Sequence, residues 1–384
     1  MDLSLTPEAE RYGQGLRAWV EDNLPQEWRD VPLGTGNDDD YVAMRRSWGR
    51  QLAEAGWMAP HWPVEYGGRG LGVDAQLAYL DVMVGSGAPE PMNTNGLNIF
   101  APALMQFGSP AQKERYLAPM VAHEEVWCQG FSEPQAGSDL GGLSTRAVPD
   151  GDKLIVSGQK VWTSYAHFAQ LCYLMVRVPG ESGGVTMVVL HMDRPGVTVR
   201  PLRNSTGSSE FCEVFLDDVV VDMDDIVGEI GGGWRAATFA LARERSSGMA
   251  QRSLQMAREL DRMVGALRAE VPDSTPETAL VDAYVRSRAV DSTVRRVLAM
   301  AADGQEPGML APCAKILWSE GHQAQLGTLV ELAGAQVSAA GPGWSDWTRA
   351  LLFSRAETIY GGTSEIQRNL VAKAMGLPSD RGQG

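Results

Sequence analysis

The sequence has few cysteines, few histidines and no long apolar run, and each shortage excludes a class of protein. Its four cysteines, Cys128, Cys172, Cys212 and Cys313, lie far apart and form no CxxC pair. Because there are also only five histidines, a disulfide framework and a zinc site are both disfavoured. A membrane span needs roughly 18 consecutive apolar residues, and the sequence contains no such run.

Positive charge is also scarce, because 33 lysines and arginines face 48 aspartates and glutamates and the net charge is -15. Nucleic acids and anionic membranes bind basic surfaces, so we expect neither as a partner. The N-terminus has no basic segment followed by an apolar one, which argues against a secretory signal. A reducing cytoplasm is therefore the expected location.

The hydrophobic period changes twice along the chain. The first ~120 residues have helical spacing, with helix starts at Thr6-Pro7-Glu8 and at the capping box Ser109–Gln112. Helical spacing returns from Gly231, and further helices are expected to start at Thr275-Pro276-Glu277 and near Pro312. Between these regions, short β-rich runs alternate with turn clusters and predict a small β-sandwich or barrel. The runs are Lys153–Gly158, Leu171–Val176, Val185–Leu190 and Phe211–Leu216.

The most informative stretch is Ile359–Arg368, which reads IYGGTSEIQR. It closely resembles the C-terminal signature of the acyl-CoA dehydrogenases. Many members of that family carry their catalytic glutamate between the tyrosine and the glycine, and here Gly361 occupies that position. The resemblance therefore implies a family whose most familiar catalytic residue is missing from its usual place.

A second stretch, Gln129–Asp139, reads QGFSEPQAGSD and resembles the family's first signature, with Gln135 where glycine is usual. Small and hydroxylated residues let a backbone approach a flat ligand and donate hydrogen bonds to it. Taken alone, such a stretch is more often a surface loop. In the family this stretch lies between the flavin and the acyl-CoA. The resemblance implies contacts with FAD or the substrate from Phe131, Ser132, Gly137 and Ser138.

A third stretch, Gly158–Ser164, reads GQKVWTS and resembles a further family motif. There the aromatic residue packs against the isoalloxazine and the following hydroxyl bonds its polar edge, roles that fall to Trp162 and Ser164. A single tryptophan is more often a core residue. Its spacing from the second stretch favours the flavin interpretation.

The three stretches and the helical–β–helical order cover nearly the whole chain, and the resemblance is closest to the bacterial FadE-type enzymes. It implies an α+β multidomain fold with an N-terminal helical domain at 1–122, a central β-sandwich or barrel at 123–228 and a C-terminal four-helix bundle at 229–384. The implied activity is FAD-dependent α,β-dehydrogenation of an acyl-CoA thioester to the enoyl-CoA. A carboxylate removes the α-proton, and flavin N5 accepts the β-hydride.

Because Gly361 occupies the usual position of the base, either another carboxylate serves or this chain does not catalyse the reaction. The pKa of such a carboxylate should be raised toward the working pH by a dry pocket. In a minority of the family, including isovaleryl- and long-chain-type enzymes, the base lies on a helix that opens the C-terminal domain, immediately before an arginine. Glu244-Arg245 matches that position, so Glu244 is the expected base and Arg245 an expected substrate contact. The alternative is that this Arg-Glu-Arg stretch is a solvated helix face.

Gly361 keeps a catalytic role in this scheme. In the family the backbone N–H at this position, with the ribityl 2'-hydroxyl, donates to the thioester carbonyl, and glycine retains that donor. The missing side chain leaves volume for a bulky or branched acyl group. Thr363 is expected to cap the following helix. The resemblance places Thr363 and Glu365 near the flavin and Tyr360 near the substrate.

Two family motifs that seat the adenine half of FAD across a subunit interface are absent. The R-x-x-F-G motif is not found around Arg262–Arg268, and Q-x-x-G-G-x-G appears only as the altered Glu331–Val337. Some related bacterial enzymes are heterotetramers in which one chain completes the flavin site of the other. The expected assembly is a homo-oligomer or a heterotetramer with a paralogous chain, with electron-transfer flavoprotein as the electron acceptor.

Other interpretations stay open at this point. The same fold supports acyl-carrier-protein dehydrogenases and flavin oxidases or monooxygenases. A non-enzymatic subunit that completes the flavin site of a partner is also compatible with the absent adenine-side motifs.

Overall fold

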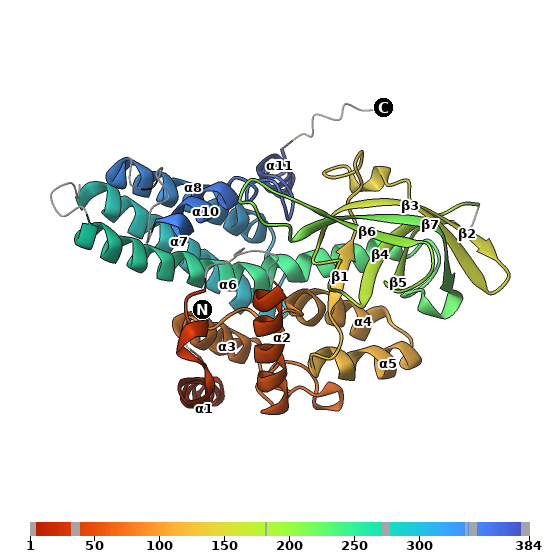
Figure 1. Cartoon of the computed structure of the whole chain (residues 1–384), viewed down its shortest axis with the longest axis horizontal. Coiled ribbons are helices and arrows are strands. Elements are labelled where there is room, and N and C mark those ends of the chain that lie inside the picture. Colours follow the sequence, from red (N-terminus) through yellow and green to blue (C-terminus); the bar gives the residue numbers. More distant parts are fainter. Residues whose placement is uncertain are drawn as a thin grey trace. The chain divides into compact units, whose positions relative to one another are not determined.

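The computed structural model describes residues 5–31, 39–180, 183–270, 277–334, 337 and 344–377, without the side chains of 242–247, 270, 277 and 302. The described residues form two compact units (Figure 1). The helical unit takes its residues from 1–34, 71–89 and 244–384, and the sheet unit takes its residues from 35–70 and 90–243.

The described strands of the sheet unit form one seven-stranded sheet in the order β1-β4-β2-β3-β7-β6, with β5 paired to β4. β1 and β2 run parallel to β4, and the other pairs are antiparallel. The strands are β1 (Trp127–Gly130), β2 (Arg146–Asp150), β3 (Lys153–Ser164), β4 (Leu171–Val178), β5 (Gly184–His191), β6 (Val197–Leu202) and β7 (Phe211–Asp222).

All four β-rich runs predicted from the sequence are confirmed, as β3, β4, β5 and β7. The sequence patterns did not reveal β1, β2 and β6. β1 has only four residues, and most residues of β2 and β6 are exposed or half-buried, so these strands lack the apolar alternation that marks a strand.

Helices of the sheet unit pack beside the sheet (Figure 1). The ring of Tyr116 meets that of Trp127 edge-on at 5.3 Å, and Phe100 stacks on Tyr173 at 4.9 Å. The predicted capping box of Ser109 is confirmed at the start of α5. These elements are α2 (Asp39–Glu54), α4 (Ala101–Phe107) and α5 (Pro110–Val121), with the short turns η2 (Val64–Tyr66), η3 (Gly96–Phe100), η4 (Leu140–Gly142) and η5 (Met223–Asp225).

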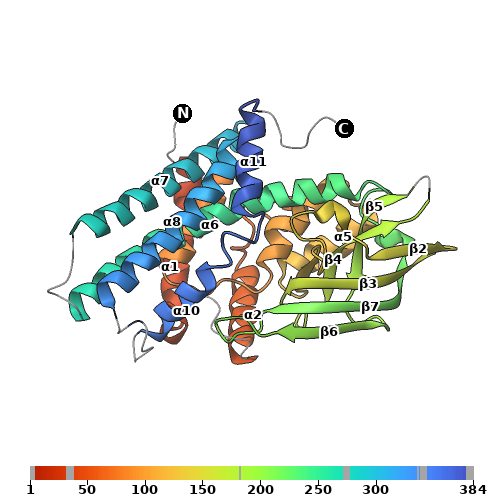
Figure 2. The ribbon, with the colours of Figure 1, turned by 90° about the horizontal axis from the view of Figure 1, so that it is seen from above.

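In the helical unit, α7 and α8 run side by side along α6 (Figure 2). Their facing side chains form one apolar core, which includes Met263, Ala283 and Leu326, and Trp347 of α10 packs into the same core. The predicted cap of Thr6 is confirmed at α1, whereas Thr275-Pro276 lies outside the described residues. The elements are α1 (Pro7–Asn23), η1 (Gln26–Trp28), α3 (Val73–Gly85), α6 (Gly233–Glu270), α7 (Glu277–Ala302), α8 (Leu310–Ala333), α10 (Ser345–Ser354) and α11 (Ser364–Ala374). α6 begins in the sheet unit, and its residues from 244 onward belong to the helical unit.

Among the described residues, no helix combines the length and the apolar character that a membrane crossing requires.

Candidate functional site

The first signature stretch leaves the sheet at the end of β1. Phe131 is buried beneath it, and Ser132 is half-buried. The Ser132 carbonyl accepts a hydrogen bond from the Val161 N–H of β3 at 2.9 Å. Gly137 and Ser138 are exposed. The stretch therefore presents a small polar surface directly beside β3, the strand that carries the GQKVWTS motif.

A buried ion pair holds these two motifs together. Lys160 Nζ lies 2.8 Å from Glu133 Oε1, and the two side chains are 0% and 1% exposed. Lys160 Nζ also donates to the Phe131 carbonyl at 3.2 Å. The carboxylate accepts two further hydrogen bonds from the backbone N–H groups of Ser144 and Thr145. Burial alone would raise the pKa of Glu133, but hydrogen bonds from Lys160 and Thr145, with the charge of Lys160, lower it to about 2.

Trp162 stands at an irregularity of β3, where the pairing with β7 shifts register between Lys160 and Thr163. Its φ is 60°, and a bulky side chain in this left-handed region strains the backbone. The indole is nevertheless 61% exposed, with the ring of Phe211 edge-on at 6.1 Å. Trp162 is therefore not a core residue. Its strained backbone holds a large aromatic surface outside the core, and Ser164 follows it, half-buried.

The C-terminal signature contains two consecutive glycines in left-handed conformations. Gly361 and Gly362 have φ values of 65° and 89°, which glycine adopts without steric cost. Their carbonyls accept hydrogen bonds from Gln367 Nε2 at 3.0 and 3.3 Å. Within the part of the chain that the structure describes, no acceptor is found for the Gly361 N–H. The proposed role of this backbone donor toward a ligand stays a prediction.

The residues that follow these glycines form the start of α11. Thr363 Oγ1 accepts a hydrogen bond from the Ile366 N–H at 3.2 Å, which confirms the predicted helix cap. The first amides of a helix favour an anionic or carbonyl group. Glu365 is exposed in the first turn of α11. Tyr360 is half-buried, and its ring lies 6.2 Å from that of Trp318 on α8.

Glu244 and Arg245 lie on α6, whose helical backbone runs through both positions. Their side chains are outside the described residues, so their roles stay predictions. Residues 335–336 of the altered adenine motif also lie outside the described residues.

The predicted site residues divide between the two units. Contacts between the first two motifs hold Phe131 and Ser132 beside β3, the strand that carries Trp162 and Ser164, whereas Gly137 and Ser138 are exposed in the same unit. The helical unit contains Glu244, Arg245, Tyr360, Gly361, Thr363 and Glu365.

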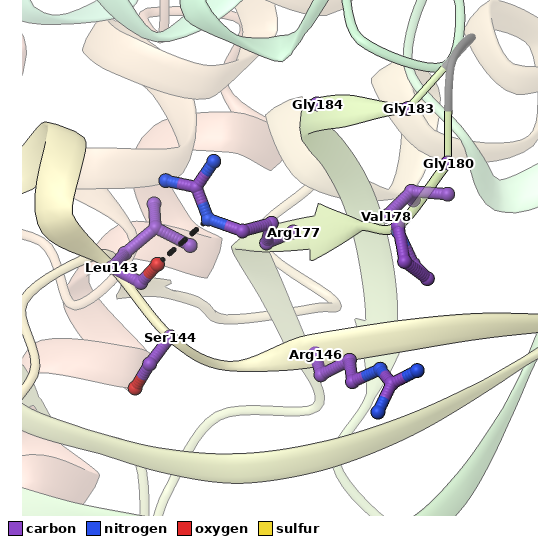
Figure 3. A pocket seen from close by; sticks show the side chains of 9 residues that line it. Leu143, Ser144, Arg146, Arg177, Val178, Gly180, Gly183 and Gly184 are labelled. Carbon is purple, nitrogen blue, oxygen red and sulfur yellow. Dashed lines mark hydrogen bonds between the residues drawn. The ribbon is translucent and has the colours of Figure 1, made fainter.

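The sheet unit also has a basic pocket that the sequence analysis missed (Figure 3). It has a volume of about 490 Å³ and lies between the start of β2 and the β4–β5 connection. Arg146 lines it from β2 and is exposed. Arg177 lines it from β4 and donates to the carbonyls of Leu143 and Gly141, at 3.0 and 2.6 Å. Neither arginine belongs to a motif that the sequence analysis recognised. They share a pocket because β2 pairs with β4, and the spacing of residues along the chain does not predict that pairing.

Three domain families match consecutive parts of this chain. They are the acyl-CoA dehydrogenase N-terminal domain over residues 6–124, the middle domain over 128–219 and the C-terminal domain over 231–376. Among related sequences, acyl-CoA dehydrogenase IpdE1 of Mycobacterium tuberculosis is 37% identical over 383 residues, which covers 97% of this chain and 99% of that protein.

Solved structures are also similar to this chain. The Tcur3481-Tcur3483 steroid ACAD has a TM-score of 0.88 and 28% identity, covering 99% of this chain and 100% of that chain. The ChsE4-ChsE5 complex from Mycobacterium tuberculosis has a TM-score of 0.82 and 28% identity, with the same two coverages. The predicted α+β multidomain fold of the acyl-CoA dehydrogenases is thereby confirmed. On this sequence and structural similarity, the chain belongs to the acyl-CoA dehydrogenase family.

Proposed function

We propose that this chain catalyses α,β-dehydrogenation of a bulky acyl-CoA thioester, with Glu244 as the base. The observation that carries the proposal is the C-terminal signature, in which Gly361 has no side chain but keeps its backbone N–H. Members of the family are oxidoreductases that bind FAD, so the cofactor is FAD.

The described residues fit this cofactor. The exposed indole of Trp162 offers a flat aromatic surface for a ring system. Ser132 and Ser164 lie beside it on the sheet unit as hydroxyl donors, and Thr363 and Glu365 are the proposed contacts from the helical unit. When bound, FAD supplies the acceptor for the β-hydride.

The chain itself must handle the α-proton. An α-proton of a thioester is too weakly acidic to leave unless the carbonyl is polarised. The Gly361 N–H is suited to donate to that oxygen, and one such donor typically contributes about 100- to 1,000-fold to the rate. Glu244 then removes the proton, for which a carboxylate with a raised pKa is required. The two residues thus divide charge stabilisation and proton removal between them.

Two observations support a bulky CoA thioester as the substrate. Glycine at position 361 leaves space where other members of the family carry a glutamate side chain, and a relative of known structure is a steroid ACAD. CoA carries anionic phosphates, and a chain with a net charge of -15 needs a local basic site for them. The pocket lined by Arg146 and Arg177 provides such a site.

We also propose that a paralogous chain completes the flavin site in a heterotetramer, with a homo-oligomer as the alternative and electron-transfer flavoprotein as the electron acceptor. Two relatives of known structure are complexes of two differently named proteins. On α7 the apolar side chains of Val281, Tyr284 and Val285 are 56–58% exposed at helical spacing, which suits an interface.

The proposal is tested by anaerobic mixing of the flavin-loaded protein with acyl-CoA thioesters while the flavin absorbance is followed. The protein is purified alone and after co-expression with its paralogue, and the flavin-to-protein ratio is measured in both. A ring-bearing acyl-CoA should bleach the flavin faster than a straight-chain acyl-CoA. Flavin-loaded protein that no acyl-CoA bleaches would contradict the proposal. Bleaching by carrier-bound acyl groups alone, or rapid reoxidation by oxygen, would point to the carrier-protein or oxidase chemistries instead.

A further inference from the structure

A buried cluster of charges joins three segments of the helical unit. His322 lies on α8, Glu259 on α6 and Glu357 in the turn that precedes Tyr360. His322 Nδ1 lies 2.8 Å from Glu357 Oε2, and Nε2 bonds the Glu259 carboxylate. The side chains of His322 and Glu357 are 13% and 6% exposed. One imidazole therefore bridges two carboxylates through both of its nitrogens.

The geometry favours a protonated His322, because only the imidazolium donates from both nitrogens to two carboxylates. Burial alone would lower the pKa of His322, but the charges and hydrogen bonds of Glu259 and Glu357 raise it to about 10. Lys315, which is 2% exposed, adds a second cation and donates from Nζ to the Glu357 carbonyl at 2.6 Å. The His322 ring thus faces both carboxylates, and Lys315 binds the backbone of Glu357.

The cluster anchors the segment that leads to Gly361. The next residue of α8 after His322, Gln323, makes a further contact with this segment, because its Nε2 donates a hydrogen bond to the Ser354 carbonyl at 2.7 Å. Glu357 is therefore held through its side chain and its carbonyl, four residues before Gly361. Beyond it the backbone turns tightly, since the Tyr360 N–H bonds the Ala356 carbonyl at 3.0 Å. Because this turn is short and hydrogen-bonded, we expect a displacement of Glu357 to move the Gly361 amide.

We propose that His322 is a positioning residue for the dehydrogenation, which fixes the Gly361 N–H by holding Glu357 against Glu259. The inference rests on the proposed function, in which that N–H polarises the thioester carbonyl. Catalytic donors act only within a narrow range of positions, and a misplacement of about 1 Å can cost about 100-fold in rate. A purely structural cluster would instead affect stability and flavin content.

The test compares His322→Gln with the matched control Glu320→Gln. Glu320 lies on the same helix, and its exposed carboxylate forms an ion pair with Arg368. Glutamine cannot carry the charge of His322, and both of its donors lie on one nitrogen rather than on the two sides of a ring. We expect kcat for an acyl-CoA to fall about ten- to hundredfold in His322→Gln, while KM and flavin content stay within about twofold. The control should match the wild type.

A spectroscopic readout reports the carbonyl directly. A conjugated enoyl-CoA such as cinnamoyl-CoA absorbs at longer wavelength when its carbonyl is polarised, so its red shift on binding should shrink in His322→Gln. If His322→Gln does not fold, Glu259→Gln, which removes the charge from the partner on α6, carries the same test. An unchanged red shift and kcat would overturn the inference, as would a parallel loss of flavin, KM and kcat. If the wild type itself shows neither bleaching nor a red shift, the proposed function fails, and the inference with it.

Discussion

Replacing Lys160 with methionine should destabilise the protein by about 3 kcal/mol at pH 7. The substitution keeps an unbranched side chain of similar length but removes the buried charge that faces Glu133. Removing one partner of a buried ion pair typically costs about 3–5 kcal/mol, because the other charge is left without compensation. Glu133 retains hydrogen bonds from Ser144 and Thr145, so the lower end of this range applies.

The pKa of Glu133 gives a second route to this magnitude. Its ordinary value is 4.5, and its surroundings lower it to about 2, which corresponds to about 3 kcal/mol of stabilisation of the folded state. Because the folded-state pKa is the lower one, this contribution is complete above pH 4.5 and is lost as the pH falls toward 2. In Lys160→Met the pKa of Glu133 should rise, so stability should fall less steeply over that acidic range.

The assay is urea-induced unfolding of the wild type and of Lys160→Met, Glu133→Gln and the double variant, each at several pH values. Lys153→Met is the matched control on the same strand, because it breaks the ion pair with Asp222 in which both side chains are more than 30% exposed. Exposed pairs contribute about 0–1 kcal/mol. The double variant should recover part of the loss. The reasoning would be refuted if Lys160→Met had a free energy of unfolding equal to or higher than that of Lys153→Met.

Three further substitutions test the candidate site. Trp162→Ala should weaken FAD binding about tenfold or more in a titration of the apoprotein, whereas the free energy of unfolding should change by no more than about 1 kcal/mol, because the indole is exposed. Gly361→Ala should cost about 1–2 kcal/mol in thermal unfolding, because its φ is 65°. It should also lower kcat/KM more for a ring-bearing thioester than for a straight-chain one, and equal losses would argue against the proposed volume at this position. Thr363→Ala should cost about 1 kcal/mol through loss of the α11 cap, and Thr363→Ser should restore it.

The sequence predicted those parts of the fold that local patterns encode. Helix starts at Thr6, Ser109 and Thr363 are confirmed, because each cap is made within a few residues by a hydroxyl and a nearby N–H. Strands that are buried on one face show an alternation of apolar and polar residues in the sequence. β2 and β6 have few buried residues, so they give no such signal.

The site was predicted from motifs rather than from contacts. The motifs predict a flavin contact for Trp162, but its exposure and positive φ come from the irregular pairing of β3 with β7. The Lys160–Glu133 pair joins residues 27 apart, and His322 meets Glu259 across 63 positions. Neither pairing follows from spacing along the chain, because tertiary packing decides which buried charges meet.

The central claim is that the base has moved from position 361 to Glu244, and Glu244→Gln tests it most directly. The variant and the wild type are loaded with FAD, mixed anaerobically with the same acyl-CoA in a stopped-flow instrument, and followed by the loss of flavin absorbance. A general base contributes about 100- to 10,000-fold, so Glu244→Gln should retain FAD and bind the thioester while its flavin is reduced slower by about that factor. Reduction at the wild-type rate would contradict the assignment.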